Sequence, residues 1–589
     1  MTEDTTRGGD SEPPKYADTN RATRCDGGRA AATESRDVWE SPVEGVATGI
    51  SKETDVPIPM RDGLELAGNV YRPEEPGEEF GEVPGEYPVI MEFTGWGKDI
   101  YWGQAQELFG EQWPGTGVGY EPWSPPVAHS CTFESENPNF WVPHGYVNIV
   151  VDGRGFGRSP GEFAGFEAWG RDMYDAIEWA ARQPWSNGKV GMSGVSILSI
   201  LQYYAAEANP PHLEAICPWQ GAPDDLYRHG GIGPVTSPTS TDDFPVPNDP
   251  AWPAPEETNP PTPDPRSEDE LFAEITQPAL ICGSWSSHGL FSRGDFRAFR
   301  NIASEDKWLY NHGREKWATF YETEAQAFRK RFFDHFLKGT DSRILDEKPV
   351  RAEVRDSLRS WSVRTADDFP LPETQYRTLH LDGTDRSLTD RGTPARASAV
   401  SYDATTTDSV AFEHTFEEET ALVGYQGLKL WVAPEDAADA DLFVTVRKLD
   451  RNGDEVKFHG YSAPLAHPVA LGFLRLSHRT LNAAKSTRWE PFLERDADPE
   501  PVEPGDPVAC QIPIRPSGTR YREGETLQVE VSGTLFGHED MTETYPARKR
   551  GETALGLETI NEGEHTIHTG GEYDSRLVIP EVPPEPPTR

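Results

Sequence analysis

The stretch Lys189-Val190-Gly191-Met192-Ser193-Gly194-Val195-Ser196-Ile197-Leu198-Ser199 decides the fold of this chain. A short apolar run leads into Gly194-Val195-Ser196, and a helix-compatible segment then extends to the stop at residues 209–211. A strand, a sharp turn with a central Ser and a helix form the layout of a nucleophile elbow. The start of such a helix points at the oxygen that becomes negative during acyl transfer. The stretch therefore predicts a strand–turn–helix unit that carries a nucleophilic serine.

Three serines compete for this role. The usual Gly-x-Ser-x-Gly pattern requires Gly at position 198, where this chain has Leu198. Ser193 lies before the expected turn, and Ser199 lies within the expected helix. Serines near the end of a strand can also simply cap the next helix. The motif alone leaves the choice between Ser193, Ser196 and Ser199 open.

The flanking sequence indicates a parallel sheet covered on both faces. Residues 146–152 read as a buried parallel strand, and residues 153–163 form a Gly-rich loop. Residues 166–181 carry apolar positions at helical spacing, and residues 183–188 turn the chain back into the elbow strand. The apolar run at 213–217 gives another strand after the elbow helix. This alternation of strands and helices predicts an α/β domain.

The same region resembles a known family, and three segments around the elbow carry the resemblance. They are Asp152-Gly153-Arg154-Gly155-Phe156-Gly157-Arg158-Ser159, then Glu178-Trp179, and then Gln183-Pro184-Trp185-Ser186-Asn187-Gly188-Lys189-Val190-Gly191-Met192 with Gly194-Val195-Ser196. The chain resembles the hydrolases related to cocaine esterase, X-Pro dipeptidyl-peptidases and α-amino-acid ester hydrolases. The resemblance runs from about residue 53 to near the C-terminus.

The resemblance, with the composition along the chain, implies the domain organisation. An α/β-hydrolase domain is expected over residues 46–345, with a short cap insertion at about 220–278. An all-β jelly-roll sandwich is expected over residues 350–585, where short alternating segments replace helix signals. Residues 1–45 are polar and without periodicity, which predicts a disordered extension.

The family's Gly-x-Ser-Tyr-x-Gly pattern assigns the nucleophile to Ser196, with Ile197 in place of the Tyr and Ser199 in place of the second Gly. The backbone N–H of Ile197 is the expected oxyanion donor because it directly follows the nucleophile. Family members carry an oxyanion-binding Tyr where this chain has Trp96. An indole N–H is also a donor, so Trp96 is a second candidate, although it could simply line the pocket.

The base and the acid should follow the last two strands of the sheet, because α/β-hydrolases have the chain order Ser…acid…His. His312 stands at the end of the strand expected at 307–311 and is the predicted base, with His288 as its rival. The family's acid lies two residues after the Trp at position 285, where this chain has Ser287. Asp295 is only a weak substitute, so the identity of the catalytic acid stays open.

The composition indicates a soluble cytoplasmic protein without a cofactor. A chain of 589 residues should hold more than one domain, and it contains no apolar run long enough to span a membrane. The five Cys residues are scattered, at positions 25, 131, 217, 282 and 510, without metal-ligand spacing or a disulfide pattern. No metal ion or organic cofactor is therefore expected.

The charge is strongly acidic. The chain has 99 Asp and Glu residues against 55 Lys and Arg, which gives a formal net charge of −44. The acidic residues are spread along the chain, so an acidic interaction tail is not expected, and nucleic-acid binding would need a basic face. We interpret the charge as adaptation to high salt; the alternative is an ordinary acidic enzyme kept soluble by repulsion.

Two functions compete at this point. The first is a serine hydrolase that cleaves ester or amide bonds of a small-molecule ester or peptide through an acyl-enzyme. The second is a non-catalytic binding protein with a degenerate α/β-hydrolase site, a hypothesis motivated by Ser287. The sequence does not distinguish esters from amino-acid esters or Xaa-Pro amides, and it does not indicate an oligomeric state.

Overall fold

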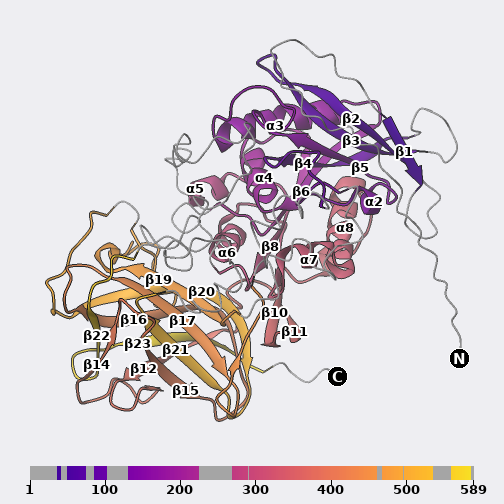
Figure 1. Cartoon of the computed structure of the whole chain (residues 1–589). Helices are drawn as coiled ribbons and strands as arrows, with labels where there is room; N and C mark the ends of the chain where they lie inside the picture. The colour runs from indigo at the N-terminus through magenta and orange to yellow at the C-terminus, as the bar shows by residue number, and fades with distance from the viewer. Residues whose placement is uncertain are drawn as a thin grey trace, which may run out of the picture. The chain divides into compact units, whose positions relative to one another are not determined.

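The computed structural model describes residues 36–40, 49–74, 85–102, 131–223, 268–288, 291–460, 467–494, 497–534 and 559–584 (Figure 1). Most of the expected cap insertion, and most of the expected N-terminal extension, lie outside these residues.

Strand β1 (Arg36–Glu40) lies within the expected N-terminal extension, and it pairs antiparallel with β2 (Gly49–Pro59). An edge strand can pair through its backbone over only a few residues. Such a short segment is too short to show a hydrophobic period in the sequence.

The first domain is built on an eight-stranded sheet with the order β2-β3-β5-β4-β6-β7-β8-β9. Strands β2, β3 and β5 pair antiparallel, and the pairs from β5 to β9 are parallel. This is the strand order of α/β-hydrolases, and it confirms the predicted parallel sheet. Besides β2, the strands are β3 (Glu65–Glu74), β4 (Tyr87–Thr94), β5 (Val147–Asp152), β6 (Ser186–Val195), β7 (Leu213–Trp219), β8 (Ala279–Ser284) and β9 (Lys307–His312).

Helices cover both faces of this sheet (Figure 1). One face carries α3 (Phe166–Ala181), α4 (Ile197–Glu207), α5 (Glu268–Ala273) and α6 (Ser292–Asn301). The other face carries α2 (Pro138–Trp141) and α8 (Thr323–Lys338), and α7 (Lys316–Tyr321) packs against α8.

The strands divide their side chains between two apolar cores, as a sheet buried on both faces requires. In β4, Met91 belongs to the core under α3 and α4, whereas the next residue towards the N-terminus, Ile90, belongs to the core under α8. The same alternation separates Ile281 from Leu280 in β8. Helix α8 ends at Gly339, whose φ of 66° is the left-handed conformation expected of a C-terminal glycine.

The second domain is β-rich and begins beside the hydrolase sheet. After the 3-10 helix η2 (Ile344–Asp346), strand β10 (Val350–Ser357) pairs parallel with β9 and antiparallel with β11 (Ser360–Ala366). A single parallel pair, Arg355 with Thr519, then joins β10 to β20 of the C-terminal domain. Strand β9 of the hydrolase sheet is therefore paired with a strand, β10, that comes later in the chain and is itself joined to the C-terminal domain.

Most strands of the C-terminal domain form two well-paired groups. The first group is β12, β23, β16 and β20, extended by β22 and β14, and the second is β19, β17, β21 and β15. Single pairs, Gly472 with Ile514 and Ser387 with Glu413, connect the groups at their two edges. The side chains between them form one apolar core. The strands are β12 (Gln375–Asp382), β13 (Ser387–Thr389), β14 (Ser398–Asp403), β15 (Ser409–Thr415), β16 (Thr420–Pro434), β17 (Asp441–Leu449), β18 (Glu455–Val456), β19 (Ala470–Arg475), β20 (Val508–Tyr521), β21 (Thr526–Ser532), β22 (Glu564–Thr569) and β23 (Arg576–Val582), with a 3-10 helix η3 (Leu476–His478).

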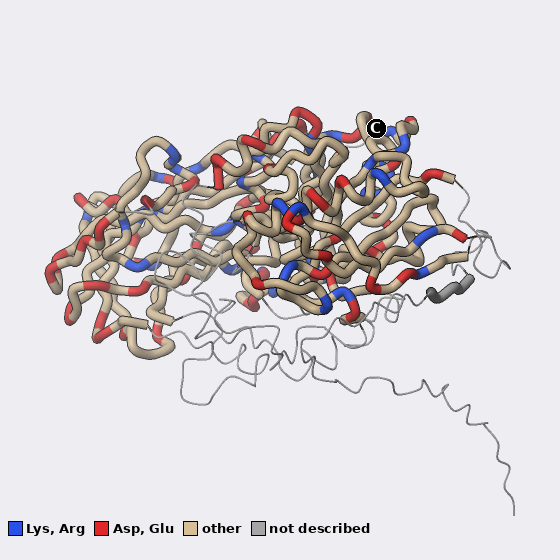
Figure 2. The backbone as a smooth tube through the Cα atoms, turned by 90° about the horizontal axis from the view of Figure 1, so that it is seen from above, with Lys and Arg blue, Asp and Glu red and all other residues tan. Residues whose placement is uncertain are grey.

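Among the described residues, Asp and Glu positions recur along the backbone and are not collected in one segment (Figure 2). In the part of the chain that the structure describes, no helix is both long and apolar enough to cross a membrane.

Candidate active site

Ser196 occupies a strained turn between β6 and α4. Its backbone has φ 61° and ψ −118°, a conformation that L-residues other than Gly rarely adopt. Its N–H donates to the carbonyl oxygen of Trp219 on the neighbouring strand, at 3.1 Å. Strain of this kind costs on the order of 1–3 kcal/mol and is concentrated at functional sites. Ser196 is partly exposed, so its hydroxyl is accessible at the carboxyl end of β6.

Two glycines make room for this turn. A side chain at Gly194, which has φ 128°, would bring its Cβ within 2.7 Å of the Leu198 Cβ. Gly194 therefore accommodates the Leu that replaces the second Gly of the usual motif. A Cβ on Gly221, in the loop after β7, would lie 2.2 Å from the carbonyl oxygen of Ser196. The loop after β7 consequently lies directly against the elbow.

The two rival serines are buried beneath the elbow. Ser193 is fully buried, and its hydroxyl donates to Glu136 Oε1 at 2.6 Å. Ser199 is also fully buried, inside α4. A hydroxyl in either position is shielded from an acyl substrate, whereas Ser196 is not.

A buried ion pair lies below Ser193. The guanidinium of Arg329, on α8, lies 3.3 Å from Glu136 Oε1, and both side chains are fully shielded from solvent. Burial, together with the charge of Glu136, raises the pKa of the nearby Glu92 well above its ordinary value. These groups connect Ser193 on β6 to α8. Ser196 stands apart from them, at the carboxyl end of β6.

Trp96 lies beside the elbow, but its indole N–H is already used. It donates to Glu134 Oε2 at 2.8 Å, and the carbonyl oxygen of Glu134 accepts the N–H of Val195 at 3.0 Å. The indole of Trp317 and the ammonium of Lys316 bind the other carboxylate oxygen of Glu134, at 2.9 and 3.3 Å. An indole has one N–H, so only a change of partner would free Trp96 for an oxyanion.

His312 ends β9 and is fully buried. Its ring stacks with Trp219 at a centroid distance of 6.1 Å, and Trp219 is also the residue that accepts the Ser196 N–H. The backbone N–H of Arg314 donates to His312 Nδ1 at 3.2 Å, and the amide of Gln220 lies 2.7 Å from His312 Nε2. Both ring nitrogens are therefore engaged.

The surroundings of His312 favour its neutral form. Burial is the largest cause of a pKa well below the ordinary value, and the positive charges of Arg314 and Arg351 lower it further. No carboxylate of the described residues hydrogen-bonds to the ring. His312 thus has the protonation state of a general base at neutral pH but lacks the anion that usually stabilises the cation it would form.

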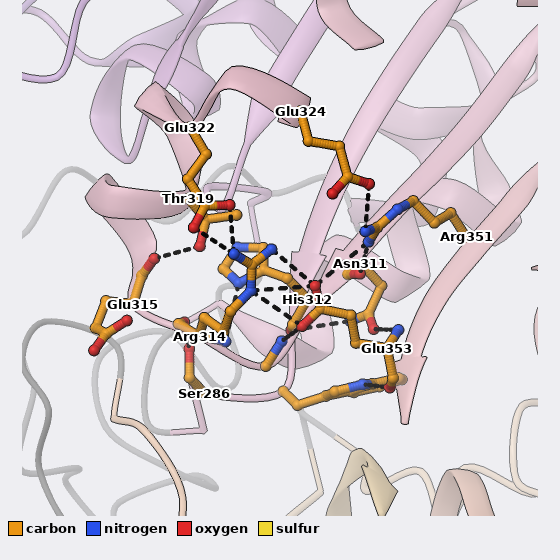
Figure 3. A network of polar contacts seen from close by, with 12 residues as sticks. Ser286, Asn311, His312, Arg314, Glu315, Thr319, Glu322, Glu324, Arg351 and Glu353 are labelled. Carbon is orange, nitrogen blue, oxygen red and sulfur yellow. Dashed lines mark hydrogen bonds and ion pairs between the residues drawn. The ribbon is translucent and has the colours of Figure 1, made fainter. Parts of the chain in front are cut away.

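A buried carboxylate fixes the turn that follows His312 (Figure 3). Glu353, on β10, accepts the N–H of Gly313 at 3.0 Å and binds the guanidinium of Arg314 at 2.8 Å. Ser286 donates to the carbonyl oxygen of Arg314 at 2.7 Å. The position of His312 therefore depends on a residue from the second half of the chain.

Among the described contacts, neither Asp295 nor Ser287, which occupies the expected position of the acid, hydrogen-bonds to His312. The hydroxyl of Ser287 accepts the N–H of Phe291 at 3.3 Å, within the loop before α6. Asp295 does point inward from α6, but its Oδ1 accepts the N–H groups of Gly221 and Ala222, both at 3.0 Å. Asp295 thus holds the loop that contacts the elbow, and it is not bound to the imidazole.

His288, the rival base, faces the C-terminal domain. Its carbonyl oxygen accepts from Arg515 Nε at 2.9 Å, and burial together with the charge of Arg355 lowers its pKa well below the ordinary value. Neither ring nitrogen has a hydrogen-bond partner among the described residues. Nothing in these contacts connects His288 to the elbow.

Several residues at the site gave no signal in the sequence. Gln220 and Glu134 both have positive φ values, 47° and 64°, which no local pattern announces for these residue types. Glu353 looks like any acidic residue of a strand. Among the described residues, no group of three or more His, Cys, Asp or Glu side chains is arranged to hold a metal ion.

Comparison with known proteins places this site in a family. Residues 62–243 match the X-Pro dipeptidyl-peptidase (S15 family), and residues 343–578 match the X-Pro dipeptidyl-peptidase C-terminal non-catalytic domain. A CocE/NonD family hydrolase from Staphylococcus aureus is 34% identical, with a TM-score of 0.77 over 91% of this chain and 94% of that structure. The chain belongs to the CocE/NonD family of hydrolases.

More distant relatives agree with this assignment. Cocaine esterase from Rhodococcus sp. (strain MB1 Bresler) is 23% identical over an alignment of 628 positions including gaps, which covers 90% of this CocE/NonD hydrolase and 98% of the esterase. An aminopeptidase from a marine sediment archaeon, Thaumarchaeota archaeon, shares the fold at 14% identity, with a TM-score of 0.63 over 91% of this chain and 97% of that one. The predicted family and the predicted acyl-hydrolase function are both confirmed.

Proposed function

We propose that this CocE/NonD hydrolase is a serine enzyme that cleaves acyl bonds through an acyl-enzyme formed on Ser196. The strained backbone of Ser196, at the carboxyl end of β6 and the start of α4, carries this proposal. The first N–H groups of a helix have no acceptor within the helix, so the N–H of Ile197 is available to an oxyanion. Trp96 is a second donor only if it releases Glu134.

His312 is the proposed base. It accepts the Ser196 proton when the acyl bond is attacked, and it returns a proton to the leaving group. Its place at the end of β9, with Trp219 in contact with both residues, supports this role. Among the described residues no carboxylate hydrogen-bonds to the ring to stabilise the imidazolium, so we propose that ester substrates, which have better leaving groups than amides, are the preferred class.

Fluorophosphonate labelling tests the nucleophile. The wild-type enzyme should be labelled, and Ser196→Ala should not. Ser193→Ala and Ser199→Ala are matched controls, because they remove hydroxyls from the same seven-residue stretch, residues 193–199, without touching the turn. Loss of labelling in either control, with labelling retained in Ser196→Ala, would contradict the assignment.

A substrate panel tests the class of acyl bond. Aryl esters, amino-acid esters and Xaa-Pro amides should be compared at equal concentration with wild type and Ser196→Ala. We expect Ser196-dependent turnover to be highest with the aryl esters. Faster turnover of the Xaa-Pro amides would assign the enzyme to the dipeptidyl-peptidases of the family.

Three further features are part of the same proposal. The C-terminal domain is a jelly-roll sandwich, in which one residue pair at each edge, Gly472 with Ile514 and Ser387 with Glu413, joins the two groups of strands. Four buried cysteines without disulfides, Cys131, Cys217, Cys282 and Cys510, suit a reducing, cytoplasmic compartment. The net charge of −44 suits a solvent of high ionic strength. The proposed substrate is a small-molecule ester or peptide.

A further inference from the structure

The contacts of the His312 ring determine which nitrogen carries its proton. The N–H of Arg314 points at Nδ1 from 3.2 Å, so Nδ1 must offer a lone pair. A neutral imidazole has one N–H and one lone pair, and the proton therefore resides on Nε2. A ring rotated by half a turn would lose both contacts, because carbon atoms would replace the two nitrogens.

Gln220 is the group that receives this proton. In the structure its amide nitrogen lies 2.7 Å from His312 Nε2, and Gln220 Oε1 is buried without a hydrogen-bond partner among the described residues. An N–H₂ group cannot accept the Nε2 proton, whereas half a turn of the amide brings the carbonyl oxygen, which can accept an N–H, to the ring. Since an amide nitrogen and oxygen are assigned from the hydrogen-bond network, the rotamer that faces Oε1 to the ring is the consistent one.

This tautomer is the opposite of the one that serine hydrolysis needs. A base that takes a proton from the nucleophile does so through a bare Nε2, with the other proton on Nδ1. With this assignment Nε2 is protonated and bound to Gln220, and Nδ1 is blocked by the N–H of Arg314. His312 can therefore act on Ser196 only after the Gln220 side chain has moved away from Nε2.

The backbone around Gln220 places this contact next to the nucleophile. Gln220 has φ 47°, and its N–H is anchored to the carbonyl oxygen of Cys282 at 3.0 Å. Its two neighbours, Trp219 and Gly221, both touch Ser196, as described above. A movement of the Gln220 side chain thus changes the base without displacing the elbow.

We propose that Gln220 is a positioning residue that holds His312 in its resting tautomer and thereby sets the rate at which Ser196 is acylated. The inference rests on the proposed roles of Ser196 and His312. A neutral hydrogen bond of this kind contributes roughly 0.5–1.5 kcal/mol. Removing it should therefore raise the rate of acylation by roughly three- to tenfold, because about 1.4 kcal/mol corresponds to a factor of ten.

Two substitutions test the proposal in opposite directions. Gln220→Leu removes the acceptor at nearly the same size, so fluorophosphonate labelling should become faster by roughly three- to tenfold. Gln220→Glu places a carboxylate beside Nε2, which strengthens the contact and favours the imidazolium. Labelling by this variant should be slower at neutral pH, and the acidic limb of its pH–rate profile should move to higher pH.

A selective ¹⁵N-histidine NMR spectrum of the wild type, assigned with His312→Gln, reads the tautomer directly. A protonated Nε2 in wild type supports the proposal, and a protonated Nδ1 overturns it. Slower labelling, or no change, in Gln220→Leu with an unaltered thermal midpoint also overturns it. Ser196→Ala distinguishes a failure of the proposed function from a failure of the role of Gln220. If Ser196→Ala is still labelled, the proposed function is wrong. If Ser196→Ala loses labelling and Gln220→Leu labels at the wild-type rate, only the role of Gln220 is refuted.

Discussion

Replacing Glu353 by Gln should destabilise the enzyme far more than the removal of one surface charge. Glu353 is fully buried, and it binds both the guanidinium of Arg314 and the N–H of Gly313. Gln at this position keeps one acceptor but turns an N–H₂ group towards a donor. Breaking a buried ion pair from one side costs about 3–5 kcal/mol, because the remaining charge is left without its partner. We expect Glu353→Gln to lose about that much unfolding free energy, less what the remaining contact of Arg314 with Glu322 recovers.

Glu324→Gln is the matched control. Glu324 also binds an arginine of β10, Arg351, at 2.8 Å, but 65% of its side chain is exposed. An exposed ion pair contributes about 0–1 kcal/mol, so this variant should stay within about 1 kcal/mol of wild type. The two variants make the same chemical change, one at a buried carboxylate and the other at an exposed carboxylate.

Urea unfolding at constant molar KCl is the suitable assay, because urea does not change the ionic strength. The midpoint should fall in Glu353→Gln with little change in the slope m, which reports the surface exposed on unfolding. Fluorophosphonate labelling should also slow, because the turn that carries His312 loses its anchor to Glu353. Equal, small losses of unfolding free energy in both variants would refute the reasoning and show that Arg314 needs only Glu322.

Three other predictions follow from single features. Ser287→Asp should raise esterase activity at least tenfold, because it restores an anion in the loop that contacts the turn after His312; unchanged kcat/KM would contradict this. The thermal midpoint should rise steadily from dilute buffer to molar KCl, because salt screens the repulsion within a chain of net charge −44; a constant midpoint would leave the acidity as a matter of solubility. Burial lowers the pKa of His565 to about 4, so the unfolded chain alone binds this proton between pH 6.5 and 4. Wild type should therefore lose up to about 3 kcal/mol more than His565→Gln between pH 7 and 4, as measured by urea unfolding at each pH.

The sequence predicted the features that are periodic or local. The elbow was visible because a strand, Gly194, Ser196 and a helix are consecutive, and β6 and α4 lie where these residues place them. The β-rich second domain was visible because alternation over a few residues marks each strand, and strands such as β12 and β17 confirm the predicted segments. Hydrophobic burial imposes these patterns on the sequence, so they can be read without the structure.

Features that depend on distant residues were not predictable in the same way. Trp96 was one candidate for the oxyanion donor, beside the alternative that it only lines the pocket, but the partner that takes its indole N–H, Glu134, lies in an insertion 38 residues further along the chain. Gln220 meets His312 across 92 residues, and Glu353 meets Arg314 across 39. A hydrogen bond between distant segments imposes no periodic pattern on the sequence and requires no particular residue type at the adjacent positions. Only the folded chain therefore shows it.

The electrostatics of His312 explain why one missing carboxylate need not abolish activity. A general base must be neutral before it accepts a proton, and burial with two nearby arginines secures that state at neutral pH. The same charges oppose the imidazolium, which the usual acid would stabilise. The loss of rate is therefore greatest in the steps in which the imidazolium must form and then protonate a poor leaving group. Amide cleavage depends most on that protonation, and esters with acidic leaving groups depend on it least. The arrangement of Ser196, His312 and Gln220 is accordingly the basis for our proposal that activated esters are the preferred substrates.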